Sequence, residues 1–467
     1  MKLARIMLAA GSSGSGKTLL TCGLLQALKD QGVNAVSFKC GPDYIDPMFH
    51  QRVLGTPSRN LDTFFTGETR TRYLLGKNAM ECDVAVMEGV MGYYDGVGGT
   101  TTRASAYDLA RVTDTPVILI VNGRGMSVSL AAYVKGFLEY KKDSHIKGVI
   151  LNQISPMLYP RMKALLEGEL GVKVLGYVPK VEDCVLESRH LGLLLPDEVK
   201  DLKGKLEKLA GILKDTLDLK GILKLAQTAG NLNMPESLAK EEEAFSFCLK
   251  EKVRIGVAKD EAFCFFYEDN FRLLKEMGAE LVWFSPLHEK TLPKNLDGLL
   301  LYGGYPELYA SALAENRSMK EEIKTAVGQG MPCMAECGGF MYLHEEMEGM
   351  DGTLHKMAGV IPGKAYRTPK LNRFGYVTLI QKEAVFGTDK LGEIPAHEFH
   401  YFDSENCGNS FLAAKPAGKR EWNCIHGGSS LLAGFPHLYY YANPNVPRAF
   451  LKGCAEYKKE KANGGRR

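Results

Sequence analysis

The segment Gly11–Thr18 constrains the fold of this chain more than any other part of the sequence. It reads Gly-Ser-Ser-Gly-Ser-Gly-Lys-Thr and fits the phosphate-binding pattern Gly-x4-Gly-Lys-Thr. An apolar run, Ile6–Ala9, precedes it, and a helical pattern, Thr18–Gln31, follows it. Phosphate-binding loops occupy this position between a buried strand and a helix. The sequence therefore predicts a P-loop domain with α/β architecture.

The residues of this loop have separate expected tasks. Lys17 should reach the β- and γ-phosphates of ATP, and Thr18 should bind the accompanying Mg²⁺. Backbone contacts to the phosphates are assigned to Gly11, Gly14, Ser15 and Gly16. P-loop ATPases that move on DNA or membranes carry a lysine directly after the first glycine. Ser12 stands there instead, which disfavours that class.

Acidic residues follow two of the predicted strands. Asp43 and Asp46 come after the second strand, and Glu88 and Asp95 come after the third. Because the carboxyl ends of parallel strands face the ligand crevice, we expect these four acids near the phosphates as catalytic groups. Asp43 and Glu88 are expected to hold Mg²⁺ together with Thr18. The alternative is that Asp43 and Asp46 cap a helix or shape a turn.

Cys337 is the candidate nucleophile of the second half of the chain. An apolar run precedes it, and Gly338 and Gly339 follow, which is typical of the sharp strand-to-helix turn called a nucleophile elbow. We expect the helix terminus to lower the pKa of the thiol. Gly303 and Gly304 end an earlier strand and are the candidate oxyanion hole. The residues alone do not choose the base among the candidate histidines His397, His400, His426 and His437.

Apolar runs alternate with helical patterns in both halves of the chain, which predicts α/β architecture throughout. In the first part the expected strands are Ile6–Ala9, Ala35–Phe38, Val84–Met87, Val117–Val121, Gly148–Leu151 and Val174–Val178. In the second part they are Val253–Ala258, Leu281–Phe284 and Leu299–Tyr302, with a helix near Asn270–Met277.

Composition excludes several classes of protein. The chain has 467 residues, 45% of them hydrophobic, which suits two or three globular domains. A net charge of only +3 argues against a nucleic-acid binder, and no apolar run is long enough to span a membrane. The 11 cysteines are scattered without a Cys-x-x-Cys pair, which predicts free thiols in the cytoplasm rather than disulfides or a zinc site.

These motifs together resemble the cobyrinic acid a,c-diamide synthase family. The resemblance spans most of the chain in the same motif order, and Lys39–His50 is its most specific part. The other matching segments are Gly11–Thr18, Asn60–Asp62, Glu88–Gly96, Arg189–Leu193, Leu301–Glu307 and Ala335–Phe340.

The resemblance implies two active sites. The first half would be similar to dethiobiotin synthetase and would phosphorylate acetate side chains of a tetrapyrrole with MgATP. The second half would be similar to class I (triad) glutamine amidotransferases, in which Cys337 releases ammonia from glutamine and His437 is the base. The implied parts are a synthetase domain at 1–195 that binds ATP and the tetrapyrrole, a helical linker at 196–251, an amidotransferase domain at 252–450 and a flexible tail at 451–467. The oligomeric state is left open, with a homodimer as one alternative.

Two departures from the family leave the orienting partner of His437 unidentified. Tyr439 stands where the family often has a second histidine, and the glutamate that follows the histidine in other triad enzymes is absent. A polyanionic substrate also needs cations, for which Lys39, Arg103 and Arg189 are candidates, with surface solvation as the alternative.

Three other functions compete with this interpretation. A sister enzyme would amidate Ni-sirohydrochlorin or hydrogenobyrinic acid with the same two sites. Cobyric acid synthase is disfavoured, because it lacks the acid-rich run within Lys39–His50. In a protein of another class, a P-loop switch, the second domain would only bind partners. Ser12 and the elbow at Cys337 disfavour the switch, and glutaminase activity discriminates it from an enzyme.

Overall fold

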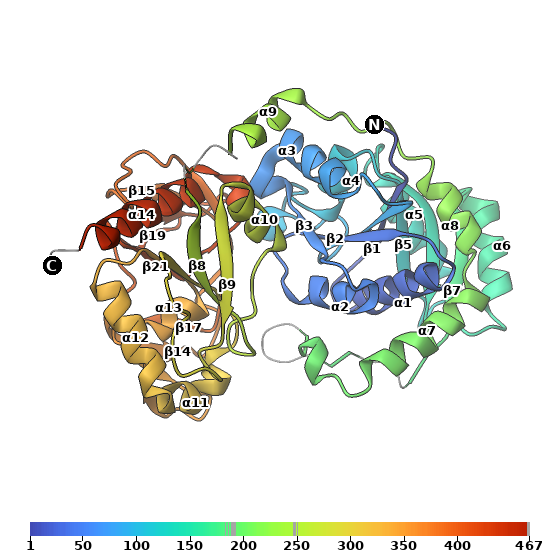
Figure 1. Ribbon diagram of the computed structural model, residues 1–467. Coiled ribbons are helices and arrows are strands. Elements are labelled where there is room, and N and C mark those ends of the chain that lie inside the picture. Colours follow the sequence, from blue (N-terminus) through green and yellow to red (C-terminus); the bar gives the residue numbers. More distant parts are fainter. Residues whose placement is uncertain (183, 185, 188–192, 246–248, 250, 465–467) are drawn as a thin grey trace. The chain divides into compact units, whose positions relative to one another are not determined.

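The alternating strands and helices of the first part of the chain form a seven-stranded parallel sheet in the computed structural model (Figure 1). The strand order is β3-β2-β4-β1-β5-β6-β7. The strands are β1 (Arg5–Ala10), β2 (Ala35–Cys40), β3 (Arg59–Leu61), β4 (Val84–Glu88), β5 (Val117–Asn122), β6 (Ile146–Asn152) and β7 (Lys173–Val178).

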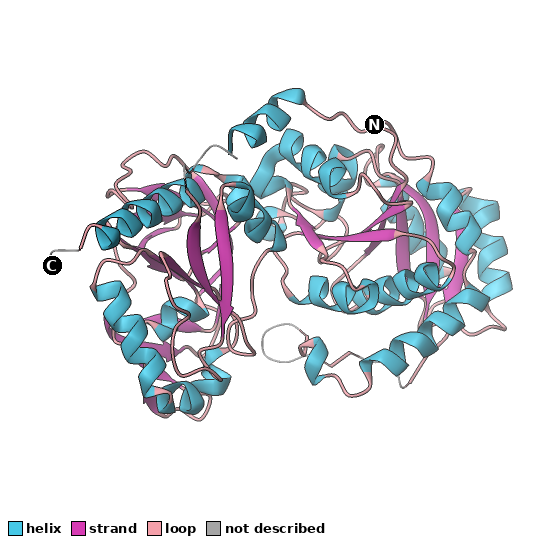
Figure 2. Ribbon diagram, viewed as in Figure 1, coloured by secondary structure: helices cyan, strands magenta, loops and turns pink. Residues whose placement is uncertain are grey.

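The structure describes residues 1–182, 184, 186–187, 193–245, 249 and 251–464. These residues divide into two units, 1–236 and 237–467. Both units are mixed α/β structures, as the sequence predicts (Figure 2).

Helices cover both faces of the first sheet, as expected for strands with continuous apolar runs. Helices α1 and α2 lie on one face and α3 and α4 on the other (Figure 1). The helices of this unit are α1 (Lys17–Asp30), α2 (Ile45–Leu54), α3 (Thr63–Asn78), α4 (Ala106–Val112), α5 (Ser129–Glu139), α6 (Tyr159–Leu170), α7 (Leu202–Thr216) and α8 (Leu219–Ala226). Short 3-10 turns are η1 (Val97–Gly99) and η2 (Pro196–Glu198).

All six strands predicted for the first part are present, and the sheet contains a seventh, β3, that was not predicted. β3 has only three residues, so it carries no recognisable apolar run. Helices α7 and α8 lie within residues 196–251, which were expected to form a helical linker. The side chains of Leu209 and Leu213 on α7 pack against Gly23 of α1, so this segment is part of the first unit.

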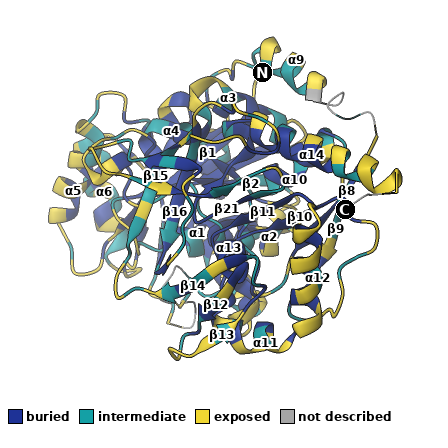
Figure 3. Cartoon of the chain, turned by 90° about the vertical axis from the view of Figure 1, so that its left-hand side faces the viewer, coloured by how far each residue is buried: buried dark blue, intermediate teal, exposed yellow. Residues whose placement is uncertain are grey.

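The second unit contains a six-stranded sheet in the order β20-β21-β11-β10-β8-β9, parallel except at its edge strand β20. Its strands are β8 (Val253–Ala258), β9 (Ala279–Phe284), β10 (Gly298–Leu301), β11 (Cys333–Glu336), β20 (His426–Gly427) and β21 (Leu431–Gly434). The central strands β8, β10 and β11 are coloured as buried in Figure 3. Helices of this unit are α9 (Glu236–Phe245), α10 (Glu268–Glu276), α11 (Ala310–Glu315), α12 (Arg317–Gly328), α13 (Gly338–Tyr342) and α14 (Asn445–Ala462).

Two smaller sheets complete this unit. One has the order β13-β12-β14-β17 and the other β19-β18-β15-β16-β22. Their strands are β12 (His344–Glu348), β13 (Leu354–Lys356), β14 (Ile361–Arg367), β15 (Arg373–Gln381), β16 (Ile394–His400), β17 (Phe402–Ser404), β18 (Phe411–Ala414), β19 (Glu421–Cys424) and β22 (His437–Leu438). The turns η3 (Pro306–Tyr309) and η4 (Tyr440–Ala442) connect elements around the main sheet.

The end of the described chain is helical. α14 runs from Asn445 to Ala462, so most of the expected flexible tail is ordered in this helix. Leu451 and Cys454 are fully buried on its apolar face, which explains why the helix does not stop at residue 450. Among the described helices, none combines the length and apolarity needed to cross a bilayer.

Candidate active sites

The phosphate-binding loop lies between β1 and α1, as predicted. Gly16 has φ 83°, a left-handed conformation that favours glycine, and it immediately precedes the first turn of α1. The side-chain amide of Asn152, at the end of β6, donates a 3.1 Å hydrogen bond to the carbonyl of Ser15 and so stabilises the loop. A cavity of about 960 Å³ lies along this loop. It is lined by Gly14, Gly16, Lys17, Thr18, Lys39, Asp43, Asp46, Glu88, Arg124 and Asn152, among others.

Two backbone carbonyl groups, one in the phosphate-binding loop and one after β4, hold the ammonium group of Lys17. Its ammonium group donates to the carbonyl of Ser12 at 2.9 Å and to the carbonyl of Met91 at 2.6 Å. Burial, followed by repulsion from Lys39, lowers the pKa of Lys17 to about 8. A lysine held by two neutral carbonyls and facing the cavity suits the binding of an anionic phosphate.

Glu88, the last residue of β4, is the centre of the polar contacts in this cavity. Its Oε1 accepts from the Thr18 hydroxyl at 2.8 Å and from the Lys39 ammonium at 2.9 Å. Its Oε2 lies 2.7 Å from Nε2 of His50 on α2. All three partners come from different elements whose ends meet at the carboxyl edge of the sheet.

Charge in this cluster is balanced within the protein. Burial opposes the Lys39 charge, but the adjacent carboxylates of Asp46 and Glu88 outweigh burial and raise the pKa of Lys39. Burial would also raise the pKa of Glu88, but Lys39 and the His50 contact outweigh it and lower that pKa. Lys39 is thus a buried cation paired with two carboxylates, and its charge is not exposed for binding a substrate carboxylate.

The other three predicted acids differ in their contacts. Asp43 lines the cavity and also accepts the backbone N–H groups of Ile45 and Asp46 at 2.9 and 3.0 Å, which is the helix-start role named as the alternative. Asp46 lines the cavity and pairs with Lys39. Asp95 accepts from Gly92 N–H at 2.9 Å and lines a neighbouring cavity with Tyr94 and Tyr133. The structure therefore groups Asp43, Asp46 and Glu88 and leaves Asp95 beside them.

The oxygen atoms at this edge fit a hard divalent cation. The Thr18 hydroxyl and a Glu88 carboxylate oxygen are 2.8 Å apart, and Asp43 lines the same cavity. Within the described residues there is no group of three or more His, Cys, Asp or Glu arranged to hold a metal without help. Mg²⁺ in nucleotide sites usually has one or two carboxylates and completes its shell with phosphates and water.

Arg103, one of the candidate substrate cations, does not line the phosphate cavity. The Arg103 guanidinium sits over the ring of Phe64 at 5.4 Å, outside the phosphate cavity. Arg189 lies outside the described residues.

Cys337 stands at the predicted elbow between β11 and α13. Its φ of 45° is positive, which is rare for a residue with a side chain and typical of strained nucleophiles. Small neighbours make this turn sterically feasible. A Cβ added at Gly339 would lie 2.0 Å from the carbonyl oxygen of Leu301, so only glycine allows this approach of α13 to β10.

The surroundings of Gly303 bring the predicted residues of this site together. A Cβ at Gly303 would lie 2.6 Å from Cε1 of His437 and 3.4 Å from the Cβ of Cys337, so the imidazole and the cysteine flank the same small volume. The amide nitrogen of Gly304 lies 3.1 Å from the corresponding position at Gly338. Cys337, His437, Gly303 and Gly304 thus form one cluster.

The structure corrects the expected thiol chemistry. Burial, with negative charge from Glu307 and other carboxylates, raises the pKa of Cys337 instead of lowering it. Helix α13 has only five residues, so its dipole is too short to offset burial. A buried neutral thiol needs a base that removes its proton during attack.

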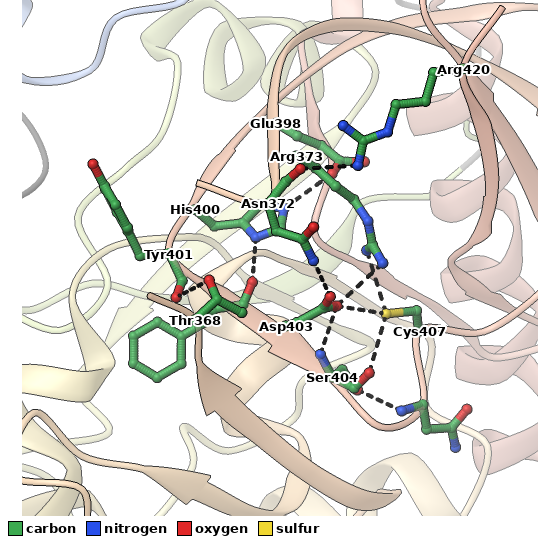
Figure 4. A network of polar contacts seen from close by, with 12 residues as sticks. Thr368, Asn372, Arg373, Glu398, His400, Tyr401, Asp403, Ser404, Cys407 and Arg420 are labelled. Carbon is green, nitrogen blue, oxygen red and sulfur yellow. Dashed lines mark hydrogen bonds and ion pairs between the residues drawn. The ribbon is translucent and has the colours of Figure 1, made fainter. Parts of the chain in front are cut away.

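Two of the other candidate histidines, His400 and His426, make contacts away from Cys337, and the third, His397, lies opposite His437. Both ring nitrogens of His400 have partners, Phe402 O at 2.6 Å and Glu398 at 3.0 Å (Figure 4). The His400 ring also stacks on Phe435. His426 contacts the carbonyl of Asn406 at 2.9 Å. Burial lowers the pKa of His397 to about 3, and this residue pairs with His437 across strands β16 and β22.

Residue-based reasoning missed three groups. His50 and Asn152 support the phosphate site, and Glu336 contacts His437. His50 ends the specific Lys39–His50 run, so a signal for it existed. Asn152 and Glu336 have no local pattern, because their partners are distant in sequence.

Comparisons with known proteins assign a family model to each half of the chain. A family model described as the CobQ/CobB/MinD/ParA nucleotide binding domain matches residues 6–193, and one described as the CobB/CobQ-like glutamine amidotransferase domain matches residues 254–435. The cobyrinate a,c-diamide synthase of Caldanaerobacter subterraneus subsp. tengcongensis is 39% identical, over 97% of this chain and 99% of that protein. Proteins of the same name from Priestia megaterium and Thermoplasma volcanium are 35% and 36% identical, and each alignment covers at least 98% of both chains.

Proposed function

This chain belongs to the cobyrinate a,c-diamide synthase family, and we propose that it converts the c and then the a acetate carboxylates of cobyrinic acid into amides. ATP activates each carboxylate, and glutamine supplies the nitrogen as ammonia. The observation that carries the proposal is the presence, in one chain, of a phosphate-binding loop facing carboxylates and a cysteine elbow beside a buried histidine.

The first step gives a poor electrophile a leaving group. An acetate oxygen of the substrate attacks the γ-phosphorus of ATP, and the bond from that phosphorus to the β–γ bridging oxygen breaks. ADP is the leaving group, and the product is an acyl phosphate. Lys17 binds the phosphate charge, while Asp46 and Asp95 orient the substrate carboxyl group. Mg²⁺ held by Thr18, Asp43 and Glu88 would neutralise the phosphate oxygens.

Ammonia then completes the amide. Its nitrogen attacks the acyl carbon, the bond from that carbon to the phosphate oxygen breaks, and phosphate leaves as the nitrogen loses a proton. Ammonium is not a nucleophile, so a chain that generates ammonia itself gains by supplying it unprotonated.

Glutamine hydrolysis supplies that ammonia. The Cys337 sulfur attacks the side-chain amide carbon of glutamine while His437 takes the thiol proton and passes it to the leaving nitrogen. The backbone N–H groups of Gly303 and Gly304 stabilise the oxyanion. Ammonia leaves, and water then attacks the thioester, releasing glutamate and restoring the thiol. Cys22, Cys40 and Cys454 are buried free thiols, which supports a reducing compartment, and we assign the enzyme to the cytoplasm.

Separate nitrogen sources test this division of labour. Cys337→Ala should abolish amidation driven by glutamine and retain amidation driven by ammonium salts at alkaline pH. Cys333→Ala is the matched control, because Cys333 is a buried thiol on the strand that leads to the elbow. Glutamine-driven amidation that survives in Cys337→Ala refutes the nucleophile. A chain without glutaminase activity would instead favour a P-loop switch.

A substrate panel tests the identity of the tetrapyrrole. Cobyrinic acid, hydrogenobyrinic acid and Ni-sirohydrochlorin are each incubated with MgATP and glutamine, and amide formation is followed by mass. We expect two amides on cobyrinic acid, with the highest kcat/KM of the three. Faster diamidation of either other macrocycle would reassign the substrate while leaving both active sites in place.

A further inference from the structure

The imidazole of His437 has a carboxylate neighbour that comes from the elbow itself. Nδ1 of His437 lies 3.6 Å from Oε2 of Glu336, and both side chains are buried. Glu336 is the last residue of β11 and directly precedes Cys337. The strand that presents the nucleophile therefore also presents a carboxylate to the base.

We propose that Glu336 is the positioning residue for His437: its carboxylate accepts the Nδ1 proton, which fixes the tautomer whose Nε2 receives the Cys337 proton. This inference rests on the proposed glutaminase function. In other triad enzymes an acid held on the far nitrogen of the histidine orients the ring and stabilises the imidazolium that forms during attack. Here that acid would precede the nucleophile rather than follow the histidine.

The contacts of Glu336 suit this task. Its Oε2 accepts from the backbone N–H of Leu438, next to His437, at 3.4 Å. Its Oε1 is buried and has no hydrogen-bond partner in the described part of the chain. A buried carboxylate oxygen without a partner is costly, and such costs concentrate at functional sites. The long contacts leave room for the pair to tighten when glutamine binds.

Rival partners for His437 are occupied. Glu398 contacts Nε2 of His400 at 3.0 Å. The hydroxyl of Tyr439, which replaces a family histidine, donates to Asp269 at 2.8 Å. Glu336, by contrast, contacts Nδ1 of His437 directly, at 3.6 Å.

Several titratable groups surround the pair and define its electrostatics. Cys337 lies on the same elbow, His397 on the adjacent strand β16, Tyr302 after β10 and Tyr440 in η4. The hydroxyls of Tyr302 and Tyr440 bond to each other at 3.0 Å. Burial raises the pKa of Glu336, and the contact with His437 opposes that rise. Glu307 and Glu398 are further carboxylates close enough to act on Cys337. Glu336 is the carboxylate in contact with Nδ1, so it is the group that would stabilise the imidazolium directly.

The decisive experiment compares pH profiles of glutamine hydrolysis. Glu336→Gln keeps the shape of the side chain and removes its charge. We expect its glutaminase kcat to fall at least about 10-fold, and the acid limb of kcat/KM to move to lower pH because the imidazolium loses its counter-charge. Ammonia-driven amidation should stay near the wild-type rate. Asp269→Asn, which neutralises a buried carboxylate bound to Tyr439, is the control and should not move the acid limb.

A second variant covers the case in which Glu336→Gln does not fold. Glu336→Asp keeps the charge but withdraws it by one methylene, so kcat should fall while the acid limb stays at the wild-type pH. An unchanged glutaminase kcat in either variant overturns the proposal. So does a lower melting temperature with an unmoved acid limb in Glu336→Gln, because that pattern marks a merely structural residue. Failure of the proposed function itself would differ: Cys337→Ala would still hydrolyse glutamine.

Discussion

The hydroxyl of Thr18 donates a 2.8 Å hydrogen bond to the carboxylate of Glu88, joining the first turn of α1 to the end of β4. These two residues are 70 positions apart in the chain. The contact brings a P-loop hydroxyl and a buried acid to one point of the cavity, where both oxygens face the expected position of nucleotide phosphates. At this edge of the sheet, nucleotide chemistry and the stability of the fold therefore depend on the same buried charges.

Loss of the Lys17 ammonium should stop amidation from both nitrogen sources. Lys17→Ala removes the cation that meets the phosphates, so acyl phosphate formation should fall by at least about 100-fold. Amide products are measured by mass with glutamine and with ammonium salts. Lys163→Ala, on the exposed face of α6, is the matched control. Turnover retained by Lys17→Ala would refute the phosphoryl step.

Replacement of Asp46 should affect chemistry more than nucleotide binding. Asp46→Asn keeps the shape of the side chain and removes the charge that pairs with Lys39. We expect kcat to fall about 10- to 100-fold with a much smaller change in the KM for ATP. Steady-state kinetics with ammonia as donor make the comparison. Equal loss of ATP affinity and turnover would show that Asp46 supports binding alone.

The Glu88 cluster should also contribute strongly to stability. Glu88→Gln leaves the buried Lys39 and the His50 ring with a neutral partner, and we expect a loss of about 3 kcal/mol in the free energy of unfolding. Glu68→Gln is the control, because Glu68 pairs with arginines at the surface, where a pair contributes less than about 1 kcal/mol. Denaturant titration of both variants decides the point, and equal losses would contradict the prediction.

His344 should make the protein less stable in acid. Burial lowers its pKa to about 4, while its ring contacts Phe340 O at 2.9 Å and Ser404 at 2.6 Å. An unfolded histidine titrates near pH 6.5, so as pH falls from there toward 4 the unfolded chain binds a proton that the folded chain does not. At pH 4 that difference favours unfolding by roughly 3 kcal/mol.

A non-titrating variant isolates this effect from the other acids and bases of the chain. His344→Gln removes the titration and retains groups for hydrogen bonding. We expect wild type to be more stable at pH 7 and the gap between the two proteins to shrink steadily toward pH 4. Free energies of unfolding measured at several pH values test this, and a constant gap would show that His344 is not neutral in the fold.

Much of the fold could be predicted from local sequence patterns, and the exceptions have physical causes. Val253–Ala258 was predicted with its observed bounds, because four of its residues are apolar and all of the strand except Arg254 is buried. Arg59–Leu61 is three polar and apolar residues at a sheet edge, with no run to detect. The end of the chain was expected to be a flexible tail, but Leu451 and Cys454 are buried and hold α14 against the core.

The sequence by itself determined two local motifs, the loop Gly11–Thr18 and the elbow at Cys337. Each is a short run of consecutive residues, and its backbone conformation depends on its own glycines. Only the tertiary structure decided which polar side chains meet: Glu88 with Thr18, and Glu336 with His437. It also decided that the Cys337 thiol is protonated, since a pKa depends on burial and on neighbours brought together from distant parts of the chain.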